Sequence, residues 1–416
     1  MQSSAIDPAR RAILTGHLGH RATPRRTAPP GLVLPAATSA VTPFRAEVPQ
    51  ALLDDLKRRL GLTRWPEQET VADWSQGVPL ARMQDVAKYW QHSYDWRRAE
   101  AKLNAFPQFR TEIDGLGIHF LHVRSRHENA LPLILTHGWP GSVFEFVKAI
   151  GPLVDPVAHG GKAEDAFHVM VPSLPGFGFS DKPREKGWNV VRIAKAWGVL
   201  MARLGYTRWV AQGGDWGAGV TTALGHVKPA GLAGIHLNWQ FVFPEKIPAM
   251  GLSPEEQGAV EAVGRFASDG YGYFNEQATR PQTMGEVLSS TPVGQAAWIY
   301  EKFQAWTDHP GDVEQLLGRD EILDDISLYW LTNTAGSSAR IYWENSPASF
   351  HGGRLDLPVA VTVFPKEIFR APRSWAEESY PQLIYWNEVA RGGHFAAFEQ
   401  PALFAQELRA GFASLR

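Results

Sequence analysis

The stretch from residue 209 to residue 224 constrains the fold of this chain more than any other. Residues 209–212 (Trp-Val-Ala-Gln) read as the end of a buried strand, residues 213–217 as a Gly-Gly-Asp-Trp-Gly turn, and residues 218–224 as the start of a helix. Small residues on either side of one side chain let a strand turn sharply into a helix and expose that side chain. The pattern predicts an α/β chain with Asp215 at such a point, and a helix-capping Asp in a glycine-rich turn is the alternative.

A carboxylate in this position indicates a particular chemistry. A serine makes an ester only by attacking an acyl carbon, and its attack on a saturated carbon would leave an ether that water does not easily cleave. A carboxylate that attacks a saturated carbon forms an alkyl ester, which water can hydrolyse at the enzyme's own carbonyl. If Asp215 is a nucleophile, it therefore favours the opening of an epoxide or the displacement of a halide.

Short apolar runs alternate with helical stretches after the polar break at residues 125–130. Unbroken runs of this length are typical of strands that are buried in a parallel sheet. The runs are residues 131–135, 167–171, 209–211, 234–237, 359–364 and 383–386. Residues 238–347 show helical and aromatic patterns instead. We expect a doubly wound, mostly parallel sheet with helices on both faces and a helical lid inserted between two groups of strands.

The N-terminal third has two patterns. Residues 42–103 are helical, with leucines on one face of residues 49–60 and a stop at Gly61. Residues 109–123 read as a hairpin, in which His119 and His122 are expected to be ordinary strand residues rather than metal ligands.

Composition excludes several classes of function. A formal net charge of -2 without a long basic run argues against a nucleic-acid partner. The absence of cysteine excludes disulfides, thiolate metal sites and cysteine catalysis. The glycines of the loop at 171–180 lack nucleotide-binding spacing, and no apolar run reaches the length of a membrane span. We predict no cofactor, no metal and no integral membrane segment.

The first 40 residues resemble an export signal only in part. Arg10-Arg11 begins a twin-arginine pattern and residues 35–40 resemble a cleavage region, but His17, His20 and several arginines interrupt the apolar segment that export requires. We expect a cytoplasmic protein with a tail that lacks stable structure, and export by a degenerate twin-arginine signal is the alternative.

The turn after the first buried strand predicts an oxyanion hole. Residues 136–142 (Thr-His-Gly-Trp-Pro-Gly-Ser) form a tight Gly/Pro turn that can aim a backbone N–H into a site. The N–H groups of Trp139 and of Trp216, the residue after Asp215, would together hold an oxyanion. A plain strand-to-helix turn is the alternative, and His137 is expected to pack beneath the turn.

The last strands offer a base and an acid. His394 lies in a glycine turn after the last apolar run, where open α/β sheets bind ligands. Glu367 follows the preceding run, whereas Asp356 comes before it and Glu399 is expected to begin or stabilise the next helix. Asp215, Glu367 and His394 have the order nucleophile, acid, histidine that is typical of the α/β-hydrolase fold.

Many short motifs resemble one known family over residues 43–407. The chain is similar to the microsomal-type epoxide hydrolases, including their bacterial and juvenile-hormone relatives. Its N-terminal matches are residues 43–44 (Pro-Phe), 54–57 (Asp-Asp-Leu-Lys), 63–66 (Thr-Arg-Trp-Pro), 94–97 (Tyr-Asp-Trp-Arg) and 119–123 (His-Phe-Leu-His-Val). The matches to catalytic motifs are residues 137–140 (His-Gly-Trp-Pro), 213–217, 364–367 (Phe-Pro-Lys-Glu) and 392–398 (Gly-Gly-His-Phe-Ala-Ala-Phe).

The resemblance implies two lid tyrosines that hydrogen-bond the epoxide oxygen. Tyr342 in residues 340–345 matches one motif, and Tyr273 in residues 272–283 best matches the other, with Tyr271 as the alternative on a shifted alignment. Such donors suit the chemistry, because an alkoxide leaving group in a water-poor pocket needs an acid. The N-terminal membrane helix of the family's microsomal members is not carried over.

The resemblance also divides the chain. It implies a tail at 1–41, an N-terminal meander region packed on the core at 42–125, an α/β-hydrolase core at 126–240 and 351–416, and a lid at 241–350. Further candidates for the lining of the pocket are His137, Phe177, Phe179, Trp343 and Phe395.

The expected function is the conversion of an epoxide to a vicinal diol. Asp215 would form an alkyl ester that a water activated by His394 and Glu367 hydrolyses, so a small-molecule epoxide and water are the expected partners. A haloalkane dehalogenase, which uses the same aspartate, and a non-catalytic binding protein on the same scaffold are the alternatives. The sequence does not decide between a monomer and a homodimer.

Overall fold

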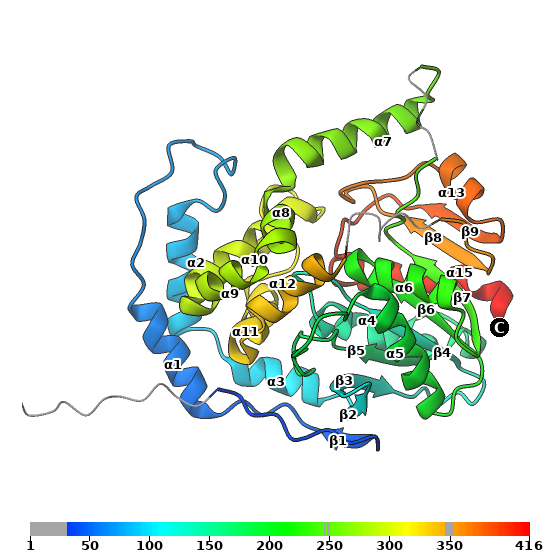
Figure 1. The fold of residues 1–416 in the computed structure, drawn as a ribbon, viewed down its shortest axis with the longest axis horizontal. Coiled ribbons are helices and arrows are strands. Elements are labelled where there is room, and N and C mark those ends of the chain that lie inside the picture. Colours follow the sequence, from blue (N-terminus) through cyan, green and yellow to red (C-terminus); the bar gives the residue numbers. More distant parts are fainter. Residues whose placement is uncertain (1–30, 245–246, 248–249, 346–352) are drawn as a thin grey trace, which may run out of the picture. The chain divides into compact units, whose positions relative to one another are not determined.

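The described part of the chain is residues 31–244, 247, 250–345 and 353–416 of a computed structural model (Figure 1). The twin-arginine pattern and residues 1–30 of the expected tail lie outside the described residues, so the cytoplasmic location stays a prediction. Within the described residues, no helix is both long and apolar enough to cross a membrane.

The described residues contain one nine-stranded sheet in the order β1-β2-β3-β5-β4-β6-β7-β8-β9. The strands are β1 (Thr42–Phe44), β2 (Gln108–Ile113), β3 (Leu116–Val123), β4 (Leu131–Thr136), β5 (Phe167–Pro172), β6 (Trp209–Gly213), β7 (Leu232–Leu237), β8 (Val359–Val363) and β9 (Leu383–Glu388). The first three strands and the pairing of β3 with β5 are antiparallel, and the remaining pairings are parallel. All six predicted runs are strands, which confirms the mostly parallel α/β fold.

The strand β1 was not predicted. It has three residues and pairs only with β2 at the edge of the sheet, and so short a segment carries no alternation that sequence reasoning can detect. The predicted hairpin is β2–β3, whose two-residue turn at Asp114 and Gly115 has positive φ at both positions (53° and 76°), as type I′ hairpin turns require.

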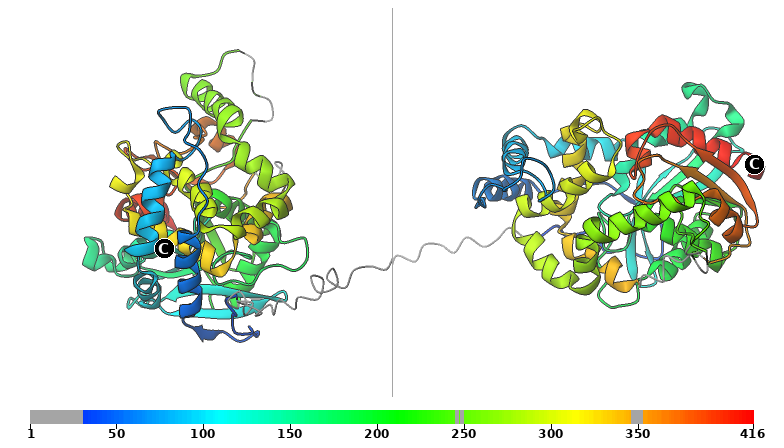
Figure 2. Two further views of the ribbon diagram at one scale, coloured as in Figure 1. Left: turned by 90° about the vertical axis from the view of Figure 1, so that its left-hand side faces the viewer. Right: turned by 90° about the horizontal axis from the view of Figure 1, so that it is seen from above.

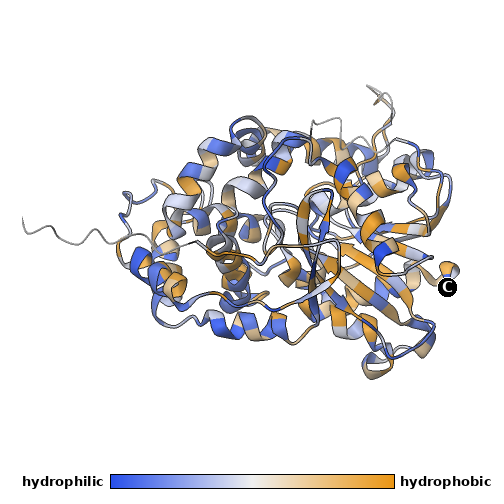
Figure 3. Cartoon of the chain, turned by 60° about the horizontal axis from the view of Figure 1, so that its bottom comes forward, coloured by the Kyte–Doolittle hydropathy of each residue, from blue (hydrophilic) through white to orange (hydrophobic). Residues whose placement is uncertain are grey.

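Helices cover the sheet and fill the long insertion. They are α1 (Gln50–Gly61), α2 (Leu80–His92), α3 (Trp96–Asn104), α4 (Val147–Val154), α5 (Val190–Arg203), α6 (Asp215–Val227), α7 (Pro254–Arg265), α8 (Gly272–Thr279), α9 (Pro281–Ser290), α10 (Pro292–Trp306), α11 (Arg319–Thr332), α12 (Ala335–Glu344), α13 (Arg373–Ser379), α14 (Ala396–Glu399) and α15 (Pro401–Gly411). In Figure 1, α5 and α6 lie in front of the sheet and α15 lies behind it. Figure 3 shows hydrophobic residues in orange along the strands between these layers.

The N-terminal helices pack against the insertion. α1 and α2 contact α10, and α3 contacts α11, which Figures 1 and 2 show as one group of helices beside the sheet. Buried polar contacts fix this packing: Trp90 Nε1 donates to Ser327 Oγ at 2.9 Å, and the Tyr94 hydroxyl donates to Asp324 Oδ1 at 2.8 Å. The N-terminal region therefore holds the insertion in place over the carboxyl ends of the strands.

The turn between β6 and α6 is as tight as its glycines allow. Asp215 has φ of +49°, a left-handed conformation that is uncommon for a residue with a side chain. A Cβ on Gly217 would overlap the carbonyl of Thr136 at the end of β4. α6 can approach β4 this closely only because position 217 has no side chain.

We predict that Gly217→Ala lowers the free energy of unfolding by about 1–3 kcal/mol, because the added methyl group forces β4 and α6 apart. Chemical denaturation measures this change. The matched control is Gly258→Ala in α7, where a Cβ would meet no atom within 4 Å, and where alanine should be neutral or stabilise the helix by up to ~1 kcal/mol. Equal midpoints for the two variants would contradict the prediction.

Candidate active site

The candidate site lies at the carboxyl ends of the parallel strands. β4 has β5 on one side and β6 on the other, and ligands bind in α/β sheets where the chain leaves neighbouring strands in opposite directions. Thr136 at the end of β4 pairs with Gly213 at the end of β6. The turns that follow these two strands therefore lie side by side, and they carry Trp139 and Asp215.

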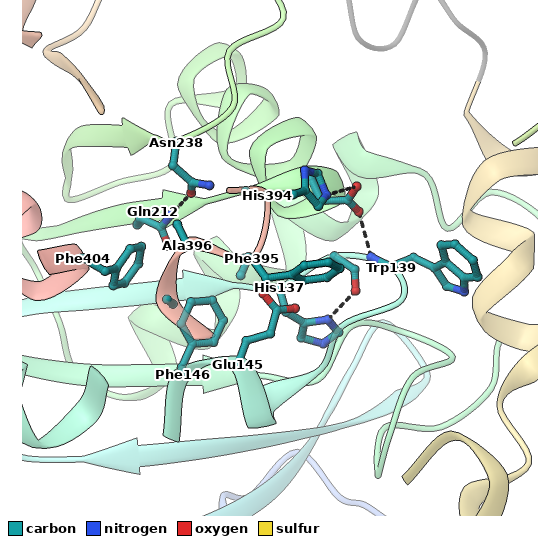
Figure 4. A pocket seen from close by; sticks show the side chains of 15 residues that line it. His137, Trp139, Glu145, Phe146, Gln212, Asn238, His394, Phe395, Ala396 and Phe404 are labelled. Carbon is teal, nitrogen blue, oxygen red and sulfur yellow. Dashed lines mark hydrogen bonds and ion pairs between the residues drawn. The ribbon is translucent and has the colours of Figure 1, made fainter. Parts of the chain in front are cut away.

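The carboxylate of Asp215 is held at both oxygens. The backbone N–H of Trp139 donates to Oδ1 at 2.7 Å, and His394 Nε2 lies 3.1 Å from Oδ2 (Figure 4). Trp216 follows in the first turn of α6, whose N–H groups point toward the helix N-terminus. The structure thus places both residues of the predicted oxyanion hole next to the carboxylate.

His394 connects Asp215 to Glu367. His394 Nδ1 lies 2.5 Å from Glu367 Oε1, which also accepts the backbone N–H of Ile368 at 2.8 Å. The Asp215, Glu367 and His394 side chains are at most 12 % exposed. The structure brings together the three residues that the sequence placed in a triad, although they lie up to 179 positions apart.

The two carboxylates set the protonation of His394. Burial alone would lower the pKa of this imidazole, but the charges and hydrogen bonds of Glu367 and Asp215 outweigh burial and raise the pKa to about 10. In the free protein His394 is therefore a cation between two anions. If Asp215 becomes a neutral ester, one of these anions is lost and the pKa of His394 must fall.

Aromatic rings enclose the imidazole. The rings of Trp239, Trp306 and Phe395 have centroids 5.0–5.2 Å from that of His394. Sequence reasoning found only Phe395, because the two tryptophans belong to distant segments whose patterns are equally typical of core packing.

Glu399 holds the turn that carries His394. Its carboxylate accepts the backbone N–H groups of Asp308, Gly393 and Phe395 at 2.8–3.0 Å. Glu399 ends α14 rather than beginning the next helix, and its side chain points back to the glycine turn. Burial raises the pKa of Glu399 to about 7, against the lowering effect of these three donors.

Two tyrosines of the insertion face the carboxylate. Tyr273 on α8 and Tyr342 on α12 are 6 % and 1 % exposed, and their ring centroids are 5.8 Å apart. The ring of Tyr342 also meets that of Trp216 at 4.8 Å, and the ring of Tyr273 stacks on Trp139 at 5.2 Å. Burial first, and then nearby groups that include the Asp215 carboxylate, raise the pKa of both phenols well above the usual value. Both are neutral hydrogen-bond donors at physiological pH.

Tyr271 takes a different position. Its ring stacks on Phe274 at 4.4 Å and contacts Phe266 at 5.5 Å, and the side chain is only partly buried. Tyr273 rather than Tyr271 lies against Tyr342, which favours the first of the two alignments.

An apolar cavity of about 170 Å³ opens in front of Asp215. Its walls are almost entirely aromatic or aliphatic, which suits an uncharged organic molecule. The lining residues are Asp215, Trp216, Trp239, Phe241, Phe243, Val263, Phe266, Tyr271, Tyr273, Phe274, Tyr342, Ile368 and Phe369. We call this the front cavity.

A smaller polar cavity lies behind the carboxylate, and Figure 4 shows its lining side chains. The predicted pocket-lining residues His137 and Phe395 line this cavity and not the front cavity. His137 Nδ1 lies 3.0 Å from the Gly138 carbonyl, and the N–H of Leu174 donates to His137 Nε2 at 3.2 Å. Burial lowers the pKa of His137 to about 4, so this imidazole is neutral and braces the turn.

The structure corrects the predicted positions of two phenylalanines. Phe177 packs against His137 and Phe179 packs against Phe44, with ring centroids 5.4 Å and 5.2 Å apart. Neither lines the front cavity or the cavity behind the carboxylate. Their loop fills the layer beneath the turn after β4 instead of bordering the substrate side.

Trp343 is also not a lining residue. It is 49 % exposed, because consecutive residues of a helix point about 100° apart and Tyr342 already faces the site. Adjacency in a motif therefore does not make both residues part of a pocket.

Among the described residues, no group of three or more His, Asp or Glu side chains is arranged to hold a metal ion. The reactive groups that meet at the end of β6 are carboxylates, an imidazole and two phenols.

Known proteins resemble this chain over most of its length. The family model "Epoxide hydrolase N terminus" matches residues 41–146, and "alpha/beta hydrolase fold" matches residues 132–253. A protein of Stigmatella aurantiaca that carries the epoxide hydrolase name provisionally is 70% identical over 90% of this chain and 86% of its own length. Epoxide hydrolase 1 of Sus scrofa is 36% identical over 90% of this chain and 89% of its own.

A solved structure agrees with the sequence matches. The crystal structure of juvenile hormone epoxide hydrolase from Bombyx mori has a TM-score of 0.84 and 30% identity, and the match covers 91% of this chain and 96% of that one.

We predict that Glu367→Gln lowers the pKa of His394, because one anion is lost while burial still opposes the cation. In the wild type, NMR of the labelled imidazole should show His394 protonated until the pH approaches about 10. The internal control is His119, whose pKa burial lowers to about 3 and which should stay neutral in both proteins.

The raised pKa of His394 also makes the free energy of unfolding depend on pH in a defined direction. The unfolded histidine has a pKa of about 6.5, so the stabilisation from the raised pKa is complete below this pH and is lost as the pH rises toward about 10. The stability advantage of the wild type over Glu367→Gln should shrink across that window. A wild-type His394 that titrates near the unfolded value would contradict the prediction.

Proposed function

Because this chain belongs to the microsomal-type epoxide hydrolase family, we propose that it converts an epoxide to a vicinal diol through a covalent ester on Asp215. The observation that carries the mechanism is the setting of this carboxylate. One of its oxygens is held by a backbone N–H and the other faces His394, and two neutral phenols lie across the front cavity. The family supports the reaction, and this geometry supports the proposed roles of the residues.

The first step opens the ring. Oδ1 is committed to the Trp139 N–H, so Oδ2 is the oxygen that attacks one epoxide carbon from the side opposite the ring oxygen. The carbon–oxygen bond of the ring breaks, and Tyr273 and Tyr342 donate hydrogen bonds to the developing alkoxide. The alkoxide takes a proton from a phenol. The imidazolium proton that His394 gives up once Asp215 is neutral restores this phenol, so the proton count closes.

The second step hydrolyses the ester. Neutral His394, oriented by Glu367, takes a proton from a water whose oxygen adds to the Asp215 carbonyl carbon. The N–H groups of Trp139 and Trp216 stabilise the oxyanion. The bond from the carbonyl carbon to the diol oxygen then breaks, and the diol takes a proton from His394. The new carboxyl group of Asp215 passes its proton to His394, which restores the Asp215–His394 ion pair.

The helical segment 241–350 is proposed to act as the lid. It carries both tyrosines on separate helices, α8 and α12, whose packing on each other brings the phenols together. A haloalkane dehalogenase would need donors that hold a halide ion, and two neutral phenols beside the nucleophile suit a developing alkoxide better. A purely binding role is disfavoured because all three triad members are in contact.

We predict that a single turnover in heavy-oxygen water gives a diol whose new oxygen is unlabelled, because it comes from Asp215. Mass spectrometry of the product measures this, and label should enter only from the second turnover. Asp215→Asn is the matched control and should lose activity, apart from slow deamidation back to Asp. Label in all of the first-turnover diol would rule out the covalent ester.

We predict that Tyr273→Phe and Tyr342→Phe each slow the formation of the ester by about 10–100-fold, because a general acid contributes roughly 10²–10⁴ in rate and here two phenols share the task. Rapid-quench kinetics with a styrene-type epoxide measure this rate. Tyr271→Phe keeps the ring and removes a hydroxyl that is not beside Tyr342, so its effect should be much smaller. A larger effect at Tyr271 than at Tyr273 would reverse the assignment.

A further inference from the structure

Asp215 stands between two cavities of opposite character. It lines the apolar front cavity and also the small cavity behind it, which we call the rear cavity. His394 lines the rear cavity and is not among the residues that line the front one. The base and the substrate pocket therefore meet the same carboxylate on different sides.

The rear cavity has the size of one water molecule. Its volume is about 20 Å³, and a water needs roughly 10–15 Å³ on this measure together with two to four polar partners. The lining residues are Thr136, His137, Gly138, Trp139, Glu145, Phe146, Gln212, Gly214, Asp215, Asn238, His394, Phe395, Ala396, Ala397 and Phe404.

Gln212 supplies a buried acceptor in this wall. The residue is 1 % exposed, and its Nε2 donates to Asn238 Oδ1 at 2.6 Å. Its Oε1 is buried without a hydrogen-bond partner in the described part of the protein. A buried amide oxygen normally accepts a hydrogen bond from protein or from ordered water. We therefore expect a small hydrogen-bond donor beside Gln212 Oε1 in the cavity.

Glu145 supplies a second polar group. It lies in the short helical turn Val143–Phe146 after β4, and its carboxyl packs against Gly141. Burial, with the charge of Asp325, raises the pKa of Glu145 well above its usual value. The raised pKa favours the protonated carboxyl, which can both donate and accept a hydrogen bond.

We propose that the rear cavity binds the hydrolytic water between Gln212, Glu145 and His394, so that water reaches the Asp215 ester from the side opposite the substrate. This inference rests on the proposed ester mechanism and adds to it the position of the water and two positioning residues. Gln212 Oε1 accepts one O–H of the water, His394 Nε2 takes the other proton, and the water oxygen bonds to the carbonyl carbon of Asp215.

Holding the substrate and the hydrolytic water in separate cavities has a chemical consequence. The front cavity can be filled completely by an apolar epoxide without displacing the water that hydrolyses the ester. During the first step His394 is a cation that cannot act as a base, so a water held this close does not compete with the epoxide. Once the ester has formed, the imidazole becomes neutral and the water is already beside it.

The test separates the two chemical steps. Rapid-quench mass spectrometry of the intact protein after mixing with a styrene-type epoxide measures both the formation and the decay of the ester. For Gln212→Met, which keeps the length of the side chain and removes the amide, we expect ester formation within about twofold of wild type. Decay should slow about tenfold, the equivalent of one hydrogen bond, so that the ester accumulates. Glu145→Met, which removes the polar head group of the side chain, should show the same selective slowing.

The matched control is Glu407→Gln. Glu407 is 3 % exposed and bonds Thr362 and Tyr385, so its loss disturbs a buried polar cluster that lines neither cavity. It should leave the ratio of the two rates unchanged. Equal slowing of both steps, or unchanged decay, in both Gln212→Met and Glu145→Met would overturn the water site. Absence of any ester in the wild type would instead refute the proposed function.

A direct measurement decides the matter if the variants do not fold. A high-resolution crystal structure of the wild-type protein should show an ordered water within hydrogen-bond distance of Gln212 Oε1 and close to His394. An empty rear cavity in that structure would overturn the proposal.

Discussion

The chain of charges from Glu367 through His394 to Asp215 is the interaction on which the rest of the site depends. Two buried carboxylates hold the imidazole as a cation, and each carboxylate in turn needs its own donor. The backbone N–H of Trp139 donates to Asp215 Oδ1, and that of Ile368 donates to Glu367 Oε1. Buried charges are tolerated only when they are paired and hydrogen-bonded, so this small network fixes the geometry of three strand ends.

In the proposed mechanism the same network couples the two chemical steps. Loss of one negative charge at Asp215 changes the imidazole from an acid into a base, and no movement of the backbone is required. The phenols of Tyr273 and Tyr342 stay neutral because they are buried near that carboxylate. Burial thus acts in opposite directions on the two kinds of group, and both results favour ring opening followed by hydrolysis.

Much of the fold could be predicted because local and global signals agree. The six apolar runs became strands, since a strand buried on both faces must be apolar along its whole length. The turn at Asp215 was visible because a sharp strand-to-helix turn requires small neighbours such as Gly217. The candidate triad followed from the position of its members after strand ends and from their order in the chain. The prediction failed for two residues whose side-chain direction the sequence does not give. Trp343 points outward, and the Glu399 side chain points back and accepts a hydrogen bond from the turn that carries His394.

The sequence by itself determined which residue types are available at each strand end, because residues that must turn, pack or react leave a local pattern. Only the tertiary structure decided what surrounds them. The division of space around Asp215 into an apolar front and a polar rear depends on Gln212 and Glu145, neither of which the sequence indicated as a site residue. Their role arises from contacts between segments distant in the chain, and no local pattern of residues encodes such contacts.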